Sequence, residues 1–188
     1  SPSGAEERAV RRTVEQMTAL GFDEARIDAA GNAVGVVRAR HPRRREAPLL
    51  LNSHLDCVDV ARGETWRHDA FDGVVADGRL WGRGASDAKS AVAAQVHAAA
   101  AIAALRERGV HLRRDVVVAS VVCEEVGGLG TACLLDEIRP AGAVVGEPSE
   151  LALAFGHRGR TEAEVAFSGR AGHAARPADA TSPVPSLA

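Results

Sequence analysis

Residues 116–130, VVVASVVCEEVGGLG, decide the fold of this chain. A run of small and β-branched apolar residues leads to two adjacent carboxylates, Glu124 and Glu125, and then to a glycine loop. Such a run is typical of a strand buried on both faces, and open α/β sheets bind their ligands at the carboxyl ends of such strands. Two carboxylates placed there repel each other unless a cation is present or one of them holds a proton. One such pair alone would indicate a solvated strand end, so the interpretation depends on the other strands.

Two further predicted strands end in side chains of the same kind. The apolar strand 48–52 runs into His54 and Asp56, and the strand 143–146 runs into Glu147. Because the carboxyl ends of parallel strands lie at one edge of a sheet, we expect these side chains to converge. The sequence therefore predicts one site built from several strand ends.

The converging residue types favour a metal site. Asp87, where a glycine loop meets the start of a predicted helix, adds a further carboxylate. Taken singly, Asp87 would be a helix cap, His54 a buried polar residue and Glu147 a turn residue. Together, one histidine and several carboxylates suit Zn²⁺, Mn²⁺ or Co²⁺, and the excess of carboxylates fits two ions bridged by one carboxylate. Asp56, two residues after His54, can accept the other ring N–H of that histidine and fix its tautomer.

The rest of the chain alternates helices and strands, which predicts an α/β fold with a mostly parallel sheet between helices. We expect a capping box at Ser3 and Glu6 to start the first helix. The other predicted elements are a hairpin around 31–32, a short hairpin around 77–78, helices over 88–108 and 129–138, and strands over 116–122, 151–155 and 160–167.

The composition fits a globular domain of 188 residues, with 46% hydrophobic residues and a net charge of −2. So small a net charge gives no indication of binding to nucleic acid or to an anionic membrane. We expect neither a signal peptide nor a membrane-spanning segment, because no apolar run is long enough. The three cysteines are an odd number without a close pair, which favours reduced thiols and a cytoplasmic location.

The ordered motifs resemble those of the aminoacylase, acetylornithine deacetylase and succinyl-diaminopimelate desuccinylase family, whose members are dinuclear zinc amidohydrolases and exopeptidases. The resemblance covers nearly the whole chain and rests on four motifs: SHLD at 53–56, WGRGASDAK at 81–89, CEEVGGLGT at 123–131 and VVGEPSE at 144–150. GHRGR at 156–160 and GRAGHAARP at 169–177 resemble that family's passage into its lid domain. The resemblance implies a zinc-exopeptidase-like catalytic domain followed by the start of a small α+β lid.

The resemblance also implies a set of metal ligands, with two Zn²⁺ per site in the full-length parent and Co²⁺ or Mn²⁺ as alternatives. His54 and Glu147 resemble ligands of one ion, Glu125 resembles a ligand of the other, and Asp87 resembles the bridging carboxylate, often followed by a cis peptide bond.

Three other residues correspond to catalytic positions of the family. Glu124 resembles the general base that takes a proton from the attacking water, and Asp56 resembles the residue that orients the ligand histidine. His173 resembles the lid histidine that reaches the active site of a partner subunit and helps to hold the substrate carbonyl. From the residues alone, Glu124 and Glu125 cannot be ranked as base and ligand.

The sequence departs from the family in what it lacks. One more ligand histidine lies far downstream in the family, so we expect a chain cut from a longer protein at both ends. Residues 1–159 would then be the N-terminal part of the catalytic domain and 160–188 the beginning of a lid that forms a homodimer. The preferred function is hydrolysis of the amide bond of an N-acyl amino acid or small peptide, and the alternative is a truncated, non-catalytic metal-binding fragment. Nucleotide binding at 82–84 is a weaker option, because no third glycine follows.

Overall fold

The computed structural model describes residues 1–40, 46–159, 161, 163–173, 175–176 and 179–182. By their contacts the residues group into two units, Ser1–Leu151 and Ala152–Ala188. The first unit carries every helix and strand named below. The predicted division into a catalytic part, 1–159, and a lid, 160–188, is a statement about function and stays a prediction.

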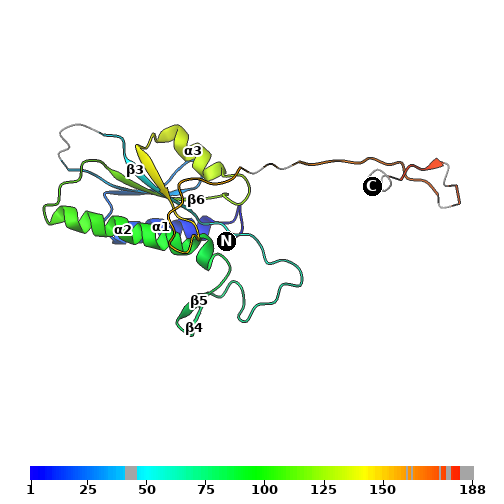
Figure 1. The fold of residues 1–188 in the computed structure, drawn as a ribbon, viewed down its shortest axis with the longest axis horizontal. Coiled ribbons are helices and arrows are strands. Elements are labelled where there is room, and N and C mark those ends of the chain that lie inside the picture. Colours follow the sequence, from blue (N-terminus) through cyan, green and yellow to red (C-terminus); the bar gives the residue numbers. More distant parts are fainter. Residues whose placement is uncertain (41–45, 160, 162, 174, 177–178, 183–188) are drawn as a thin grey trace. The chain divides into compact units, whose positions relative to one another are not determined.

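A five-stranded sheet in the order β1-β2-β6-β3-β7 forms the centre of the first unit (Figure 1). The strands are β1 Glu24–Ile27, β2 Ala33–Val37, β3 Leu49–His54, β6 Val116–Val121 and β7 Gly142–Val145. β3 pairs in parallel with both β6 and β7, whereas β2 pairs antiparallel with β1 and β6. The sheet is therefore mixed rather than mostly parallel, because β1 and β2 form the predicted hairpin and the hairpin joins β6 antiparallel. The α/β class with helices over a central sheet is confirmed.

The helices cover the two faces of the sheet (Figure 1). They are α1 Glu7–Ala19, α2 Ser90–Glu107 and α3 Leu129–Glu137. Met17 of α1 and Val96 of α2 pack with Val118 of β6 in one apolar cluster. Leu134 of α3 packs with Val117, the neighbour of Val118 along β6, in a second cluster. Since neighbouring side chains of a strand point to opposite faces, β6 is buried on both faces, as its sequence predicts.

The helical stretch Ala85–Glu107 is, by length and composition alone, apolar enough to cross a membrane. The expectation that no such run exists was therefore too strong. In the structure, Val92, Val96 and Ala99 of this stretch are buried in the cluster over the sheet. A core helix of this kind passes the same test of length and hydropathy as a membrane helix, so the finding is weak support for a membrane span.

The start of α1 differs from the predicted capping box. The helix begins at Glu7, and Glu6 stands at the N-cap position without a side-chain cap. The Ser3 hydroxyl instead donates a hydrogen bond to Asp56 Oδ2 at 2.7 Å, and Glu6 Oε1 accepts one from the backbone N–H of Cys123 at 3.1 Å. Both side chains therefore bond residues that are distant in the sequence and do not cap the helix. The other predicted hairpin is present, as β4 Val74–Ala76 and β5 Arg79–Trp81.

The strands predicted over 151–155 and 160–167 do not form among the described residues of the second unit, and residues 160 and 162 lie outside those residues. Among the described residues of this unit, an antiparallel bridge joins Arg170 and Thr181. Leu153, Phe155 and Val165 remain largely exposed, at 77%, 93% and 70%. The apolar pattern is one of residues suited to burial, but strands also need neighbours, and the described residues supply none for these segments.

Candidate metal centre

The carboxyl ends of the three parallel strands lie side by side and bring the predicted site together. His54 is the last residue of β3, and Glu124 and Glu125 follow the end of β6. Glu147 follows the end of β7, one residue after a backbone hydrogen bond from Gly146 N–H to Asn52 O. The strand register that buries the apolar residues therefore also places these side chains at one edge of the sheet.

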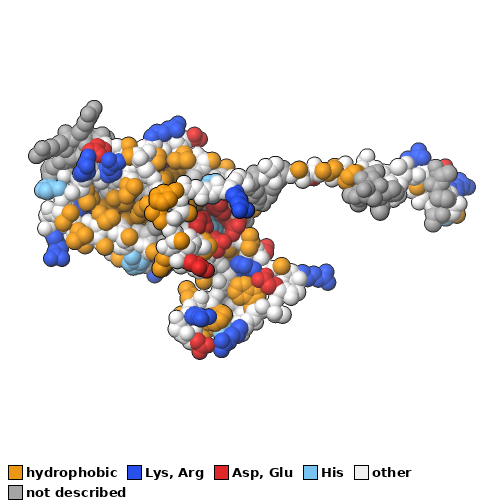
Figure 2. Space-filling view, viewed as in Figure 1, with side chains coloured by type: hydrophobic (Ala, Val, Ile, Leu, Met, Phe, Trp, Pro, Cys, Tyr) orange, Lys and Arg blue, Asp and Glu red, His pale blue; other side chains and the backbone are white. Residues whose placement is uncertain are grey.

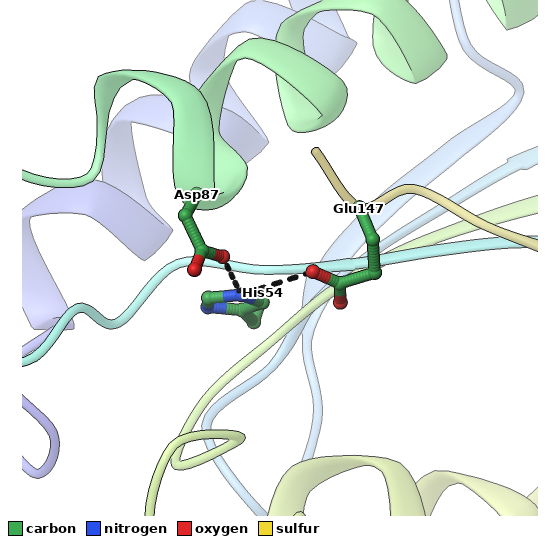
Figure 3. A group of neighbouring side chains, drawn as sticks. All are labelled: His54, Asp87 and Glu147. Atoms are coloured by element: carbon green, nitrogen blue, oxygen red, sulfur yellow. Dashed lines mark hydrogen bonds and ion pairs between the residues drawn. The ribbon is translucent and has the colours of Figure 1, made fainter. Parts of the chain in front are cut away.

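His54 lies at the centre of the group (Figure 3). Its Nε2 atom is 2.9 Å from Asp87 Oδ1 and 3.9 Å from Glu147 Oε2, and both carboxylates point toward the imidazole ring. Glu124 Oε2 lies 4.0 Å from the same nitrogen. The potential ligand atoms form two groups, each within 4.8 Å: His54 with Asp87 and Glu147, and His54 with Glu124 and Glu125.

In the first group, the distances from His54 Nε2 are close to those that a metal ion requires. Zn–N and Zn–O bonds of about 2.0–2.2 Å in a tetrahedral site put neighbouring ligand atoms roughly 3.4 Å apart. The separations of His54 Nε2 from Asp87 and Glu147, 2.9 and 3.9 Å, lie on either side of that value. Each of these two distances therefore differs by about half an ångström from the spacing of two ligand atoms on one ion. The imidazole and carboxylate donors suit Zn²⁺, Co²⁺ or Mn²⁺ and do not single out one of them.

A backbone carbonyl sets the tautomer of His54. The Nδ1 atom hydrogen-bonds to the carbonyl oxygen of Asp56 at 3.1 Å, while the Asp56 carboxylate is 3.5 Å away. Since a carbonyl can only accept, Nδ1 carries a hydrogen. The contact of Nε2 with Asp87 Oδ1 is a hydrogen bond when Nε2 is protonated, and Nε2 would present its lone pair to a bound ion instead. The hydrogen bond to the ring thus comes from the main chain of Asp56 rather than from its carboxylate, and the orienting role of Asp56 stays a prediction.

The Asp56 carboxylate is fully buried and has a different set of contacts. It accepts the hydroxyl of Ser3 at 2.7 Å and the backbone N–H groups of Glu124 and Glu125 at 3.1 Å each. Burial alone would raise the pKa of Asp56, but these hydrogen bonds outweigh it and lower the pKa. The carboxylate therefore stays ionised and ties the strand end that carries His54 to the one that carries the two glutamates.

The electrostatics of the group call for a cation. Acidic side chains gather on the face of the first unit shown in Figure 2. His54 is buried, and three carboxylates lie within 4.0 Å of its Nε2 atom. Burial disfavours the charged imidazole, yet the hydrogen bond with Asp87 and the nearby glutamates raise the pKa of His54. Burial and neighbouring carboxylates, Asp87 foremost, raise the pKa of Glu125 and Glu147. The raised pKa values mean that these side chains take up protons more readily than they would in isolation. A divalent ion would offset the same negative charge.

The two remaining residues of the prediction lie in different settings. Asp87 is in the short turn Ala85–Lys89 before α2, and its peptide bond to Ala88 is cis, as the resemblance implies. His173 belongs to the second unit, where its Nδ1 accepts a hydrogen bond from the backbone N–H of Ala175 at 3.2 Å. The other predicted site residues belong to the first unit, and the role of His173 stays a prediction.

The sequence predicted no role at the site for three residues that the structure places beside it: Ser3, Glu6 and Asn32. Each bonds either the Asp56 carboxylate or the backbone after β6. Their side chains carry no local pattern that would have revealed this. In the sequence, Ser3 and Glu6 read as a capping box and Asn32 as half of a turn.

A sequence profile described as Peptidase family M20/M25/M40 matches residues 50–181. An uncharacterized protein of Escherichia coli, YgeY, is 31% identical over 180 residues, covering 94% of this chain and 43% of that protein. A succinyl-diaminopimelate desuccinylase of Cereibacter sphaeroides is 37% identical over 186 residues, covering 92% of this chain and 47% of the enzyme. The chain therefore spans a little under half the length of these curated relatives.

The fold is also found among solved structures. The structure of human carnosine dipeptidase 1 superposes with a TM-score of 0.59 at 20% sequence identity, over 78% of this chain and 35% of that one. At this level of identity the likeness supports the α/β fold.

Proposed function

This chain belongs to peptidase family M20/M25/M40, and from that premise we propose that it forms the metal-binding part of a hydrolase that cleaves the amide bond of an N-acyl amino acid or small peptide. The observation that carries the proposal is the convergence of three carboxylates on one buried imidazole nitrogen, at 2.9, 3.9 and 4.0 Å. The name of the related desuccinylase, which specifies removal of a succinyl group from an amino acid, supports an acyl-amino acid as substrate.

His54, Asp87 and Glu147 would hold one zinc ion, and Glu125 together with Asp87 would contribute to a second. A bound ion of this kind lowers the pKa of water and stabilises negative charge on a carbonyl oxygen. Cobalt or manganese could take the place of zinc with the same donors.

The chain's own residues supply the rest of the chemistry. Glu124 is 45% exposed and lies beside the ligand group, so its carboxylate can accept a proton from water and pass it to the leaving amine. Its backbone N–H donates to Asp56 Oδ1 at 3.1 Å, so the backbone is held in place while the side chain stays partly exposed. His54 stays with its hydrogen on Nδ1 throughout, since the Asp56 carbonyl can only accept.

The parts of the proposal that lie beyond the first unit come from the family resemblance. Residues 160–188 would begin a lid through which two chains pair, and His173 would help to hold the substrate carbonyl of the partner. The donors at residues 54, 87 and 147 would complete one metal position, while the second position would have no histidine besides His54 among the described donors. The cytoplasmic location rests on the cysteine pattern alone.

The test begins with metal content, measured by plasma mass spectrometry on the chain after equilibration with zinc. We expect about one ion per chain, lost in Glu147→Ala and kept in Glu125→Ala. Asp136→Asn, an exposed residue of α3, is the matched control for the loss of one carboxylate. No bound metal in the wild-type chain would contradict the proposal.

Hydrolysis is then measured as amine released from N-succinyl and N-acetyl amino acids and from dipeptides, with zinc, cobalt or manganese added. Replacing a general base typically lowers the rate by about 10²–10⁴-fold, so Glu124→Gln should lose turnover while keeping its metal. Metal binding without turnover in the wild type would favour the alternative, a non-catalytic metal-binding fragment.

A further inference from the structure

The segment 122–125 is held by side chains from three distant parts of the chain. Its first N–H donates to Asn32 Oδ1 at 3.0 Å, and its second donates to Glu6 Oε1 at 3.1 Å. Its last two donate to the two carboxylate oxygens of Asp56, at 3.1 Å each. Four successive backbone donors thus each have a side-chain acceptor, and all three acceptor residues are buried. We call the side chains of Glu6, Asn32 and Asp56 the acceptor cradle.

Asn32 closes the loop that carries the two glutamates at both of its ends. Its Oδ1 takes the N–H of Val122, and its Nδ2 donates to the carbonyl of Gly130 at 2.9 Å and to Asp28 Oδ2 at 2.8 Å. One acceptor oxygen and both amide hydrogens are therefore used, which fixes the orientation of the side chain. Gly130 lets the loop come this close, because a Cβ there would collide with Asn32 Oδ1.

Glu6 holds a residue whose backbone lies in the left-handed region. Cys123 has φ = 55°, in the left-handed region that residues with a Cβ seldom adopt. Its N–H and its thiol both approach Glu6 Oε1, at 3.1 and 3.7 Å. Glu6 is only 4% exposed, so the contact is sheltered from water. A conformation of this kind persists where the surroundings determine it, and Glu6 is part of those surroundings.

We propose that Glu6 and Asn32 are positioning residues of the metal centre, which set where the Glu124 and Glu125 carboxylates stand relative to His54. The role at a metal centre rests on the proposed function, whereas the hydrogen bonds of the acceptor cradle do not depend on it. Neither side chain is placed among the potential ligand groups, so each acts through the backbone that it holds. Outer-shell partners of this type commonly alter metal affinity about 10–100-fold when they are removed.

The first measurement is amide hydrogen exchange in the metal-free chain, resolved by NMR at residues 122–125. Glu6→Ala should speed exchange at Cys123 and Asn32→Ala at Val122, while Glu6→Gln, which keeps an acceptor oxygen, should stay near the wild type. Asp23→Asn is the control, because Asp23 binds Arg106 at the opposite end of α2 and its loss would weaken the fold without touching the cradle. Unchanged exchange in both alanine variants would overturn the proposal.

The second measurement is cobalt affinity, followed by the visible absorption of the bound ion and by competition with a chelator. Measurements are made well below the unfolding temperature of every variant. We expect Glu6→Ala and Asn32→Ala to bind cobalt about 10–100-fold more weakly, because the two glutamate charges then lie farther from the ion that His54, Asp87 and Glu147 would hold. Glu125→Ala, which keeps this ion at saturating metal, should show a weaker affinity as well, with Glu6→Gln and Asp23→Asn close to the wild type.

The outcomes separate the two proposals. Faster exchange with unchanged cobalt affinity would overturn the positioning role and leave the proposed function intact. An equal loss of affinity in Asp23→Asn would overturn it as well, since the effect would then be one of general stability. A wild-type chain that binds no cobalt would contradict the proposed function, and the positioning role with it.

Discussion

Replacing Asp56 with asparagine should destabilise the fold strongly, although the two side chains have nearly the same shape. The carboxylate accepts hydrogen bonds from Ser3, Glu124 and Glu125 in a site without solvent exposure. An amide offers only one oxygen, so its NH₂ group would face the backbone N–H of Glu124 or Glu125. One buried donor would then lack an acceptor, and the other hydrogen bonds would lose their charged partner.

The size of the effect follows from these contacts. A hydrogen bond to a charged group contributes about 1.5–3 kcal/mol, and a buried donor without a partner costs about 1–3 kcal/mol. Removing the buried negative charge recovers part of this free energy, because it reduces the repulsion from the other carboxylates of the site. We therefore expect Asp56→Asn to lower the free energy of unfolding by about 2–4 kcal/mol. For a chain of this length that corresponds to a fall in Tm of roughly 4–16 °C.

The effect should also depend on pH in a defined direction. The pKa of Asp56 in the fold lies below that of an unfolded aspartate, about 3.9, because its hydrogen bonds outweigh its burial. A lowered pKa contributes stability above the unfolded value, and this contribution is lost as the pH falls through the folded pKa. The difference between wild type and Asp56→Asn should therefore be constant from pH 7 to about pH 5 and shrink below about pH 4.

The assay is urea unfolding followed by circular dichroism at several pH values, on metal-free protein. Asp136→Asn, which removes an exposed carboxylate from α3, controls for the change in net charge. A stability of Asp56→Asn equal to that of the control would refute the reasoning. So would a difference that stays the same from pH 7 down to pH 3, because the carboxylate would then not be the source of it.

Four further outcomes can be checked. Arg106→Ala should cost about 3–5 kcal/mol in urea unfolding, since the Arg106 side chain is only 4% exposed and its removal leaves Asp23 without its cation. Gly146→Ala should cost about 1–3 kcal/mol and weaken metal binding, because a Cβ would come within 2.8 Å of Gln95 Nε2 at the strand end that carries a ligand. Zinc at a hundredfold excess over its Kd should raise the stability by about 2.7 kcal/mol in thermal unfolding, and His54→Ala should abolish this. Because the pKa of His54 is raised and the proton competes with the ion, zinc affinity should fall as the pH drops from 8 to 6.

The core of the fold could be predicted because its signals are local. Val116–Val121 is a continuous run of small and β-branched residues, and it forms the central strand buried on both faces. The hairpins around 31–32 and 77–78 follow from their turn residues. The strands at 151–155 and 160–167 could not be decided in this way, since an apolar alternation shows which residues suit a strand and not whether a neighbouring strand exists to pair with it.

The convergence of His54, Asp87 and Glu147 could be predicted for a topological reason. Parallel strands end at the same edge, so residues 93 positions apart meet there once the sheet forms, as the bond from Ser53 Oγ to Gly146 O illustrates. The contacts within the site could not be predicted with the same certainty. The expected partner of the His54 ring was the carboxylate of Asp56, but the backbone carbonyl of Asp56 accepts the hydrogen bond instead.

The residues that hold the segment 122–125 were beyond the reach of sequence reasoning for a related physical cause. Glu6 and Asn32 bond backbone N–H groups that lie 117 and 90 residues away. A backbone donor is the same at every position, so nothing in the residue type at 122 or 123 shows that it needs an acceptor. Catalytic and ligand side chains can be found from the sequence by their chemistry. Residues that support a backbone are found only when the acceptor of each buried backbone N–H is known from the structure. In this chain, acceptors for the segment that carries the two glutamates come from the start of α1 and from the turn between β1 and β2.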